Sequence, residues 1–224
     1  MKDLHASRAT YLVSRLVAEG EHENQDFKFT VNDPRKIARS VSAFANHSGG
    51  RLLIGVTDNG VPRGVRSEED IYVVEAAARM YCDPPCEPSF TAYRVEGGAT
   101  VIRADISPAD HRPVRVVEAD GTRHAYYRVA DENILAHPLM VRAWTAADTR
   151  KDGVVFELNA DRSALIALLD NGPVTPEEAL TRLDMSHRTF ESVVIDLTVL
   201  GIIEFRYIDR HFHIARTDGE HSAR

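Results

Sequence analysis

The sequence predicts an α+β fold, in which a mixed α/β domain precedes a small domain of three helices and a hairpin. Helical apolar repeats and short strand-like runs alternate over residues 1–147. A polar, glycine-ended stretch follows, and residues 158–216 then contain three helical patterns and two strands around a turn. A length of 224 residues suits two domains of these sizes.

The first domain should begin with a short helix near residues 12–17 and a strand over 26–31. Asp33 and Pro34 predict a helix start, because Asp caps helix N-termini and Pro fits the first helical position. Ser48 and two glycines end that helix. The further elements expected are strands at 52–56, 89–95, 100–106 and 124–129, a tight turn at 58–60, and helices at 67–81 and 137–146.

The second domain reads as a winged helix-turn-helix over residues 158–216. Thr175 and Glu178 form a capping box around Pro176, and Ser186 caps the third helix. A hairpin around residues 209–210 would be the wing. We therefore expect a first domain at 1–147, a linker at 148–157 and a flexible tail at 217–224.

Charge and cysteine content restrict the possible functions. The net charge is −7, with −2 in residues 1–150 and −5 in residues 151–224, whereas nucleic-acid binders are usually basic. No apolar run approaches the roughly 20 residues of a membrane span. The two cysteines, Cys82 and Cys86, form no disulfide framework and no zinc pattern. We expect structural cysteines, a cytoplasmic protein and no membrane partner.

Acidic side chains gather where the first strand begins. Glu21, Glu23 and Asp26 precede or enter this strand, and Lys28 follows them. Clustered carboxylates can hold a divalent cation, and a neighbouring lysine can steady a phosphate. Asp58 follows the next strand and would join the cluster if the two strands were neighbours. A solvated acidic loop is the simpler interpretation of the same pattern.

Several segments resemble the Schlafen AlbA_2 domain. They are Asp26-Phe27-Lys28, the helix end Ala43-Phe44-Ala45-Asn46, the run Gly49-Gly50-Arg51-Leu52-Leu53-Ile54-Gly55-Val56-Thr57-Asp58-Asn59-Gly60, and the stretch Tyr126-Tyr127-Arg128-Val129-Ala130. The resemblance covers roughly residues 8–145. Bacterial proteins that join this domain to a helix-turn-helix are the most similar in pattern.

The resemblance implies a nucleic-acid-binding, regulator-like protein. Some animal Schlafen proteins cut RNA with three acids, and by motif position these would be Glu21, Asp26 and Asp58, acting on Mg²⁺ or Mn²⁺. The family's usual Glu is Asp26 here, which shortens one ligand. The usual glycine is Ala130, which disfavours a positive φ. A homodimer would have to supply the second lobe that the animal enzymes carry.

Basic residues near these motifs are the candidate phosphate contacts. An arginine-rich composition suits bidentate contact with phosphate, and a positive face can exist on an acidic protein. Scattered arginines paired with acids are an equally good interpretation. The candidate nucleic-acid-binding residues are Lys28, Lys36, Arg39, Arg51 and Arg128 in the first domain, and Arg188 and Arg210 in the winged helix.

Three functional hypotheses follow. The leading one is a DNA- or RNA-binding regulator with no certain cofactor. The second is a ribonuclease that depends on a divalent metal and uses Glu21, Asp26 and Asp58. The third is a protein-interaction or dimerisation module that does not contact nucleic acid, which the acidity of residues 151–224 favours.

Overall fold

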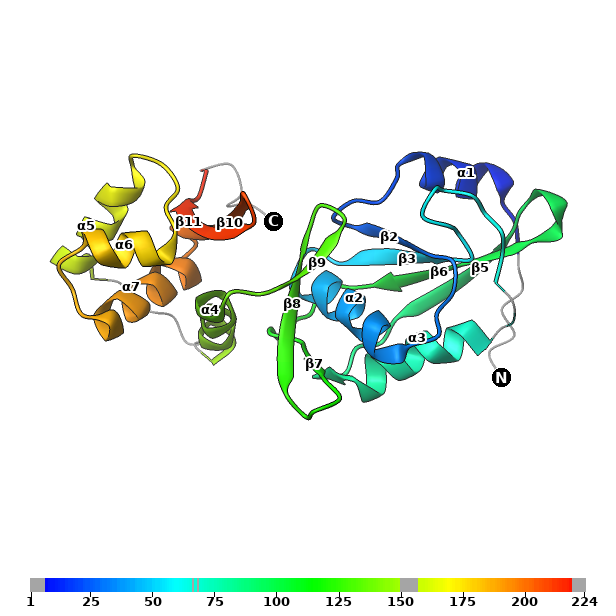
Figure 1. Cartoon of the computed structure of the whole chain (residues 1–224), viewed down its shortest axis with the longest axis horizontal. Coiled ribbons are helices and arrows are strands. Elements are labelled where there is room, and N and C mark those ends of the chain that lie inside the picture. The colour runs from blue at the N-terminus through cyan, green and yellow to red at the C-terminus, as the bar shows by residue number, and fades with distance from the viewer. Residues whose placement is uncertain (1–6, 66, 68, 150–156, 219–224) are drawn as a thin grey trace. The chain divides into compact units, whose positions relative to one another are not determined.

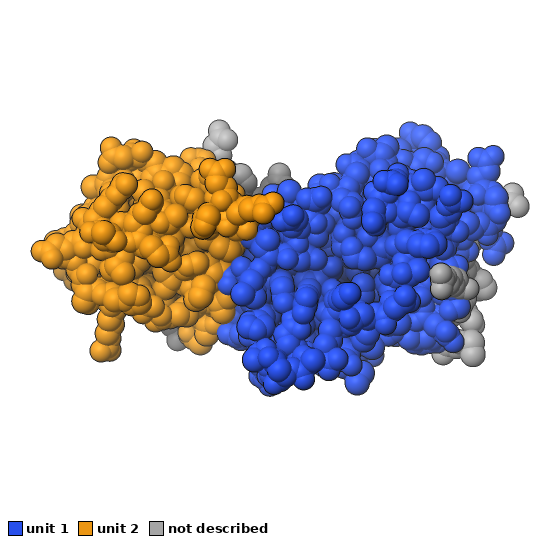
Figure 2. All heavy atoms as spheres, in the orientation of Figure 1, with its two compact units in different colours: residues 1–136 blue, residues 137–224 orange. Residues whose placement is uncertain are grey.

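Helices and strands alternate through the computed structural model, which describes residues 7–149, apart from 66 and 68, and residues 157–218. The predicted α+β class is confirmed. The chain divides into two compact units, residues 1–136 and 137–224 (Figure 2).

A mixed five-stranded sheet forms the centre of the first unit (Figure 1). Its strands are β1 (Ser7–Arg8), β2 (Gln25–Lys28), β3 (Gly50–Ile54), β5 (Ser89–Arg94) and β6 (Thr100–Ile106). Their order is β1-β5-β6-β3-β2. Strand β2 is parallel to β3 and β1 is parallel to β5, whereas β6 is antiparallel to both of its neighbours. Strand β2 is therefore an edge strand.

Helices cover both faces of this sheet. Successive side chains of a strand point to opposite faces, so a strand with consecutive apolar residues needs a cover on each face. Leu53 of β3 packs in a cluster with α1 (Thr10–Ala18). Leu52, one residue earlier, packs in another cluster with α2 (Pro34–Asn46) and α3 (Glu69–Met80). Both leucines are fully buried, so β3 is a strand with two apolar faces.

Helix α2 begins and ends at the signals that the sequence predicted. The Asp33 side chain accepts hydrogen bonds from the backbone N–H groups of Arg35 and Lys36. After the helix, Gly49 has a φ of +79°, and a Cβ atom on Gly50 would lie 2.3 Å from the Phe44 ring. The two glycines thus supply a left-handed turn and a close helix–strand approach.

A second sheet, antiparallel and four-stranded, packs against α2 (Figure 1). Of its strands, the sequence pattern predicts only β8, because the others are short. Its order is β4-β7-β8-β9, and its strands are β4 (Cys82–Asp83), β7 (Arg115–Val117), β8 (Arg123–Val129) and β9 (Glu132–Leu135). A short 3₁₀ helix, Glu96–Gly98, joins β5 to β6. Ala130, between β8 and β9, adopts a φ of +49° although it is not glycine, contrary to the expectation from its side chain.

The second unit contains four helices and a hairpin within the residues described. They are α4 (Pro138–Thr149), α5 (Ala160–Leu169), α6 (Pro176–Arg182), α7 (His187–Val199), β10 (Ile203–Ile208) and β11 (His211–Arg216). The predicted capping box of Thr175 and Glu178 is present, and Ser186 caps α7. Helices α5 to α7 and the antiparallel hairpin appear in the predicted order.

The boundary between the units lies earlier than the expected 147. The units divide after Ala136, because α4 packs on α7 of the second unit and buries Leu139, Met140 and Ala143. Helix α4 also runs to Thr149, into the expected linker 148–157. Residues 150–156 of that linker and 219–224 of the expected tail lie outside the described residues.

In the described parts of the chain, no helix combines the length and apolar character that crossing a membrane requires.

Candidate functional site

A pair of carboxyl groups lies at the edge strand β2. Asp26 is buried on this strand, and Glu21 lies in the preceding loop, where its Oε1 accepts a hydrogen bond from the Phe27 N–H at 2.8 Å. The carboxyl groups of Glu21 and Asp26 interact, which raises the pKa of Glu21. The Lys28 Nζ lies 2.8 Å from Asp26 Oδ2. We call Glu21 and Asp26 the acid pair.

Glu21 holds its proton more tightly than a lone carboxyl group does. Burial raises the pKa of Glu21 above its ordinary 4.5, and the interaction with Asp26 raises it further. The Phe27 N–H and the Lys28 charge oppose this shift of the Glu21 pKa. Two neighbouring carboxyl groups can act in acid–base chemistry or bind a cation.

Asp58 does not join the pair. It lies exposed in the turn that follows β3. Among the residues described, no three His, Cys, Asp or Glu side chains gather as a metal-binding group requires. The structure thus brings together two of the three acids expected from the resemblance, Glu21 and Asp26.

Arg128, expected to contact nucleic acid, is instead a buried structural residue with 1% exposure. Its guanidinium donates hydrogen bonds to the carbonyl oxygens of His22 and Gln25 and to Asn133 Oδ1, at 2.9–3.4 Å. It also lies 3.7 Å from Asp26 Oδ1. Burial lowers the pKa of Arg128 below its ordinary value, and the nearby acids oppose that shift. Arg128 therefore holds the strand that carries Asp26.

Three more of the expected basic residues are paired with acids. Lys28 pairs with Asp26, as described above. Arg39 makes two hydrogen bonds to Glu118, at 2.9 and 3.1 Å, and Arg51 pairs with Glu19 and donates to Gln25 Oε1. These pairs place carboxylates where a phosphate would have to bind. They match the alternative interpretation, arginines paired with acids.

The other three expected basic residues are exposed, and none forms an ion pair with the residues that the structure describes. Lys36 lies in the first turn of α2. Arg188 lies in the first turn of α7. Arg210 lies at the tip of the β10–β11 hairpin, with a φ of +65°. These cations remain available to an anionic ligand.

Asn46 has a structural role that the sequence pattern does not predict. This last residue of α2 is fully buried. Its Nδ2 donates to the carbonyl oxygens of Val114 and Tyr126, and its Oδ1 accepts from the Val114 N–H at 2.8 Å. Asn46 thus fastens α2 to the four-stranded sheet. A polar residue at the end of an apolar helical face was the available signal.

The first unit is thus an α+β domain in which three elements meet around Arg128. They are the edge strand β2 with its acid, helix α2 with its buried asparagine, and strand β8 with its Tyr-x-Arg motif. The Schlafen AlbA_2 family model matches residues 21–137, which is more than half of the chain. The chain belongs to this family.

Two solved structures are similar to the chain. One is the crystal structure of the DIP2311 protein from Corynebacterium diphtheriae, with 19% identity and a TM-score of 0.45, and the match covers 85% of this chain and 34% of that one. The other is the solution structure of the N-terminal domain of a RecG-related DNA helicase-like protein from Nitrosomonas europaea. It has 25% identity and a TM-score of 0.40, over 58% of this chain and 95% of that one. None of the curated proteins matches the chain.

Proposed function

We propose that this chain is a nucleic-acid-binding, regulator-like protein of the bacterial AlbA_2 type, with a winged helix as its second unit. The observation that carries the proposal is the exposure of Arg188 and Arg210 with no ion pair among the described residues, whereas most basic candidates of the first unit are paired. Membership of the AlbA_2 family supports the same role.

The second unit has the elements that this role requires. Helix-turn-helix proteins place the N-terminal residues of the recognition helix against base edges. Here that position belongs to α7, whose cap Ser186 leaves His187 and Arg188 exposed in the first turn. The hairpin would be the wing, and Arg210 would reach a phosphate from its tip. Lys36 of α2 would add a contact from the first unit.

The acidic net charge does not exclude this role, because local charge matters more than the sum. Several acids of the second unit are neutralised within it: Asp170 by Arg216, Asp196 by Arg162 and Glu191 by Arg142. Glu177 and Glu178 in α6 would still repel phosphate. Binding should therefore be weak and strongly salt-dependent.

The test is fluorescence anisotropy of the full chain with duplex DNA, single-stranded RNA and double-stranded RNA over a series of salt concentrations. Binding should weaken as salt rises. Arg188→Ala and Arg210→Ala should each weaken it and reduce the salt slope by about one. Arg79→Ala is the control, because Arg79 is exposed but pairs with Glu87 at 3.5 Å.

Absence of binding to every probe at low salt would overturn the proposal. It would favour the alternative of a protein-interaction module that does not contact nucleic acid. A homodimer and a cytoplasmic location belong to the proposal as well. Light scattering tests the first, because a dimer doubles the molar mass.

The acid pair supports a second proposal, a metal-dependent endoribonuclease. Side-by-side carboxylates suit Mg²⁺ or Mn²⁺, and Glu21 and Asp26 would be the ligands. The metal would activate water and stabilise a leaving oxygen. The fit is incomplete, because Asp58 stays apart and Asp26 already contacts Lys28 and the Ser40 hydroxyl.

Cleavage of structured RNA with and without Mn²⁺ tests this second proposal. Glu21→Gln should abolish cleavage while RNA binding persists, because it removes a ligand and keeps the side-chain shape. Asp58→Asn should cleave normally if the pair alone is the site. Cleavage that survives Glu21→Gln would refute a role for the acid pair.

A further inference from the structure

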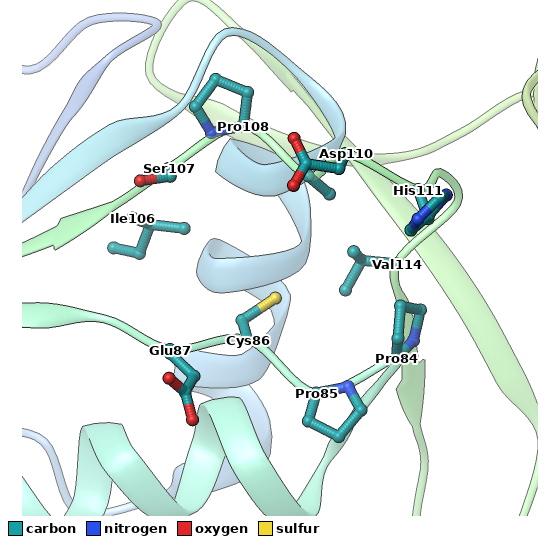
Figure 3. Close-up of a pocket in the computed structure, with 11 residues that line it drawn as sticks. Pro84, Pro85, Cys86, Glu87, Ile106, Ser107, Pro108, Asp110, His111 and Val114 are labelled. Carbon is teal, nitrogen blue, oxygen red and sulfur yellow. The ribbon is translucent and has the colours of Figure 1, made fainter. Parts of the chain in front are cut away.

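A pocket of about 270 Å³ lies beside the start of the four-stranded sheet. Apolar side chains and prolines form much of its wall, and the titratable groups on its rim are Glu87, Asp110 and His111. Figure 3 shows the sulfur of Cys86 pointing into the ring of lining residues. A nucleophilic thiol thus faces this pocket.

A second thiol, that of Cys82, lies on the core side of Cys86. Cys82 on β4 is buried at 4% exposure in the main core cluster, whereas Cys86 is half-buried. The Cys82 thiol lies 3.8 Å from the Ala38 carbonyl oxygen, and Cys86, four residues further along the chain, packs against the same core cluster and interacts with Cys82. One sulfur therefore faces the pocket and the other lies within reach of it from the core side.

This interaction shifts the pKa values of the two thiols in opposite directions. It lowers the pKa of Cys86 below its ordinary 9.0, and burial opposes this shift. The same interaction and burial raise the pKa of Cys82. Because the thiolate is the nucleophile, the accessible Cys86 reacts first and Cys82 stays protonated.

We propose that Cys86 and Cys82 form a peroxide-responsive thiol pair, in which Cys86 is the attacking thiol and Cys82 the resolving thiol. The Cys86 thiolate attacks one oxygen of hydrogen peroxide and breaks the O–O bond, which gives a sulfenic acid and, with one proton, a molecule of water. The Cys82 sulfur then attacks the Cys86 sulfur, and the sulfenic oxygen leaves as a second water. Peroxide is reduced, and the two thiols are oxidised to one disulfide.

The pocket has room for a small oxidant. A water molecule in the liquid takes up about 30 Å³. A pocket of about 270 Å³ therefore admits a hydroperoxide and its leaving water with space to spare. Accessible thiols of lowered pKa next to a resolving cysteine are typical of redox sensors. The pair thus has a role beyond the structural one that the sequence predicted.

The experiment treats the reduced full chain with hydrogen peroxide and measures intact mass and free thiols. The expected product has lost two hydrogen atoms and both free thiols. Its disulfide lies within one chain and does not link two chains, and dithiothreitol returns the protein to its starting mass. The chain has only two cysteines, so an intramolecular disulfide has one possible assignment. Alkylation of the folded chain should modify Cys86 at least about tenfold faster than Cys82.

Single variants separate the two roles. In Cys82→Ser, Cys86 should stop at the sulfenic acid, which dimedone traps, and then gain further oxygen. In Cys86→Ser, Cys82 should resist the same peroxide dose. Sulfinic acid on Cys86 of the wild-type chain without a disulfide, equal alkylation of both thiols, or a disulfide only between chains would overturn the proposal. The wild-type measurements suffice if either variant fails to fold.

Discussion

At the scale of single residues, a buried guanidinium is tolerated only when its donors and its charge are satisfied. Arg128 meets both conditions through two backbone carbonyls, Asn133 and the nearby Asp26. We expect Arg128→Met to lower the free energy of unfolding by about 3–5 kcal/mol, because it leaves buried carbonyls without donors and Asp26 with one cation fewer.

Urea unfolding followed by circular dichroism measures this effect. Arg79→Met is the matched control and should change stability by less than about 0.5 kcal/mol, because it lies on the surface. If Arg128→Met were as stable as the wild-type chain, the buried network would not hold β2.

A glycine provides the second residue-scale prediction. A Cβ atom on Gly50 would lie 2.3 Å from Cδ1 of Phe44, which is fully buried and cannot move aside freely. Gly50→Ala should therefore lower the free energy of unfolding by about 1–3 kcal/mol. In a Phe44→Leu background the same substitution should cost less, and the double-mutant cycle measures the difference. Additive effects would contradict this contact.

At the scale of elements, one carboxylate ties α2 to the four-stranded sheet. Glu118, next to β7, accepts two hydrogen bonds from Arg39 of α2 and one from the Tyr126 hydroxyl of β8 at 2.7 Å. The hydrogen bond from Arg39 is the main cause that lowers the pKa of Glu118 below 4.5. A carboxyl group whose pKa is lower in the folded state stabilises it above the unfolded pKa, and this contribution is lost as the pH falls.

We therefore expect Glu118→Gln to be less stable than the wild-type chain at neutral pH and equally stable well below pH 4.5. Urea midpoints measured over this range test the prediction. Glu21 has the opposite sign, because its raised pKa favours the folded state at low pH and the contribution is lost as the pH rises. A constant difference between Glu118→Gln and wild type at every pH would refute the linkage.

Long, strongly patterned elements could be predicted from the sequence, and short ones could not. Helices α2 and α7 carry caps and apolar faces, which are local signals. Strands β4 and β9 are only two and four residues long, so they carry too little pattern. Pairing stabilises them: β4 pairs with β7, which lies more than 30 residues further along the chain, and β9 pairs with the preceding strand β8.

At the scale of the whole molecule, α4 shows where the second unit begins. Leu139, Met140 and Ala143 are buried, and α4 packs on α7. A fragment of residues 137–218 should therefore unfold cooperatively. A fragment of residues 158–218 should be less stable by about 3 kcal/mol or more, because it exposes the apolar surface that α4 covers. Equal stability of the two fragments, measured by thermal and urea unfolding, would place α4 outside the second unit.

The charge that the surface exposes is also a property of the whole molecule, because folding pairs or buries many charged side chains. The sequence places many arginines near its motifs and suggests a positive face. In the structure, Arg39 and Arg51 point their charges at Glu118 and Glu19, and Arg128 is buried. Composition could not reveal these pairs, because the partners of Arg39 and Arg51 lie 79 and 32 residues away in sequence.

The α+β class, the helix caps, the family motifs and the order of elements in the second unit can be predicted from the sequence, because each depends on residues close together in the chain. Three properties require the three-dimensional structure: which acids meet, which cations stay unpaired within the described residues, and which thiol faces a pocket. Those properties depend on burial and on contacts between distant segments. Glu21 therefore meets Asp26 while Asp58 stays apart, and Arg128 supports the strand from inside the core.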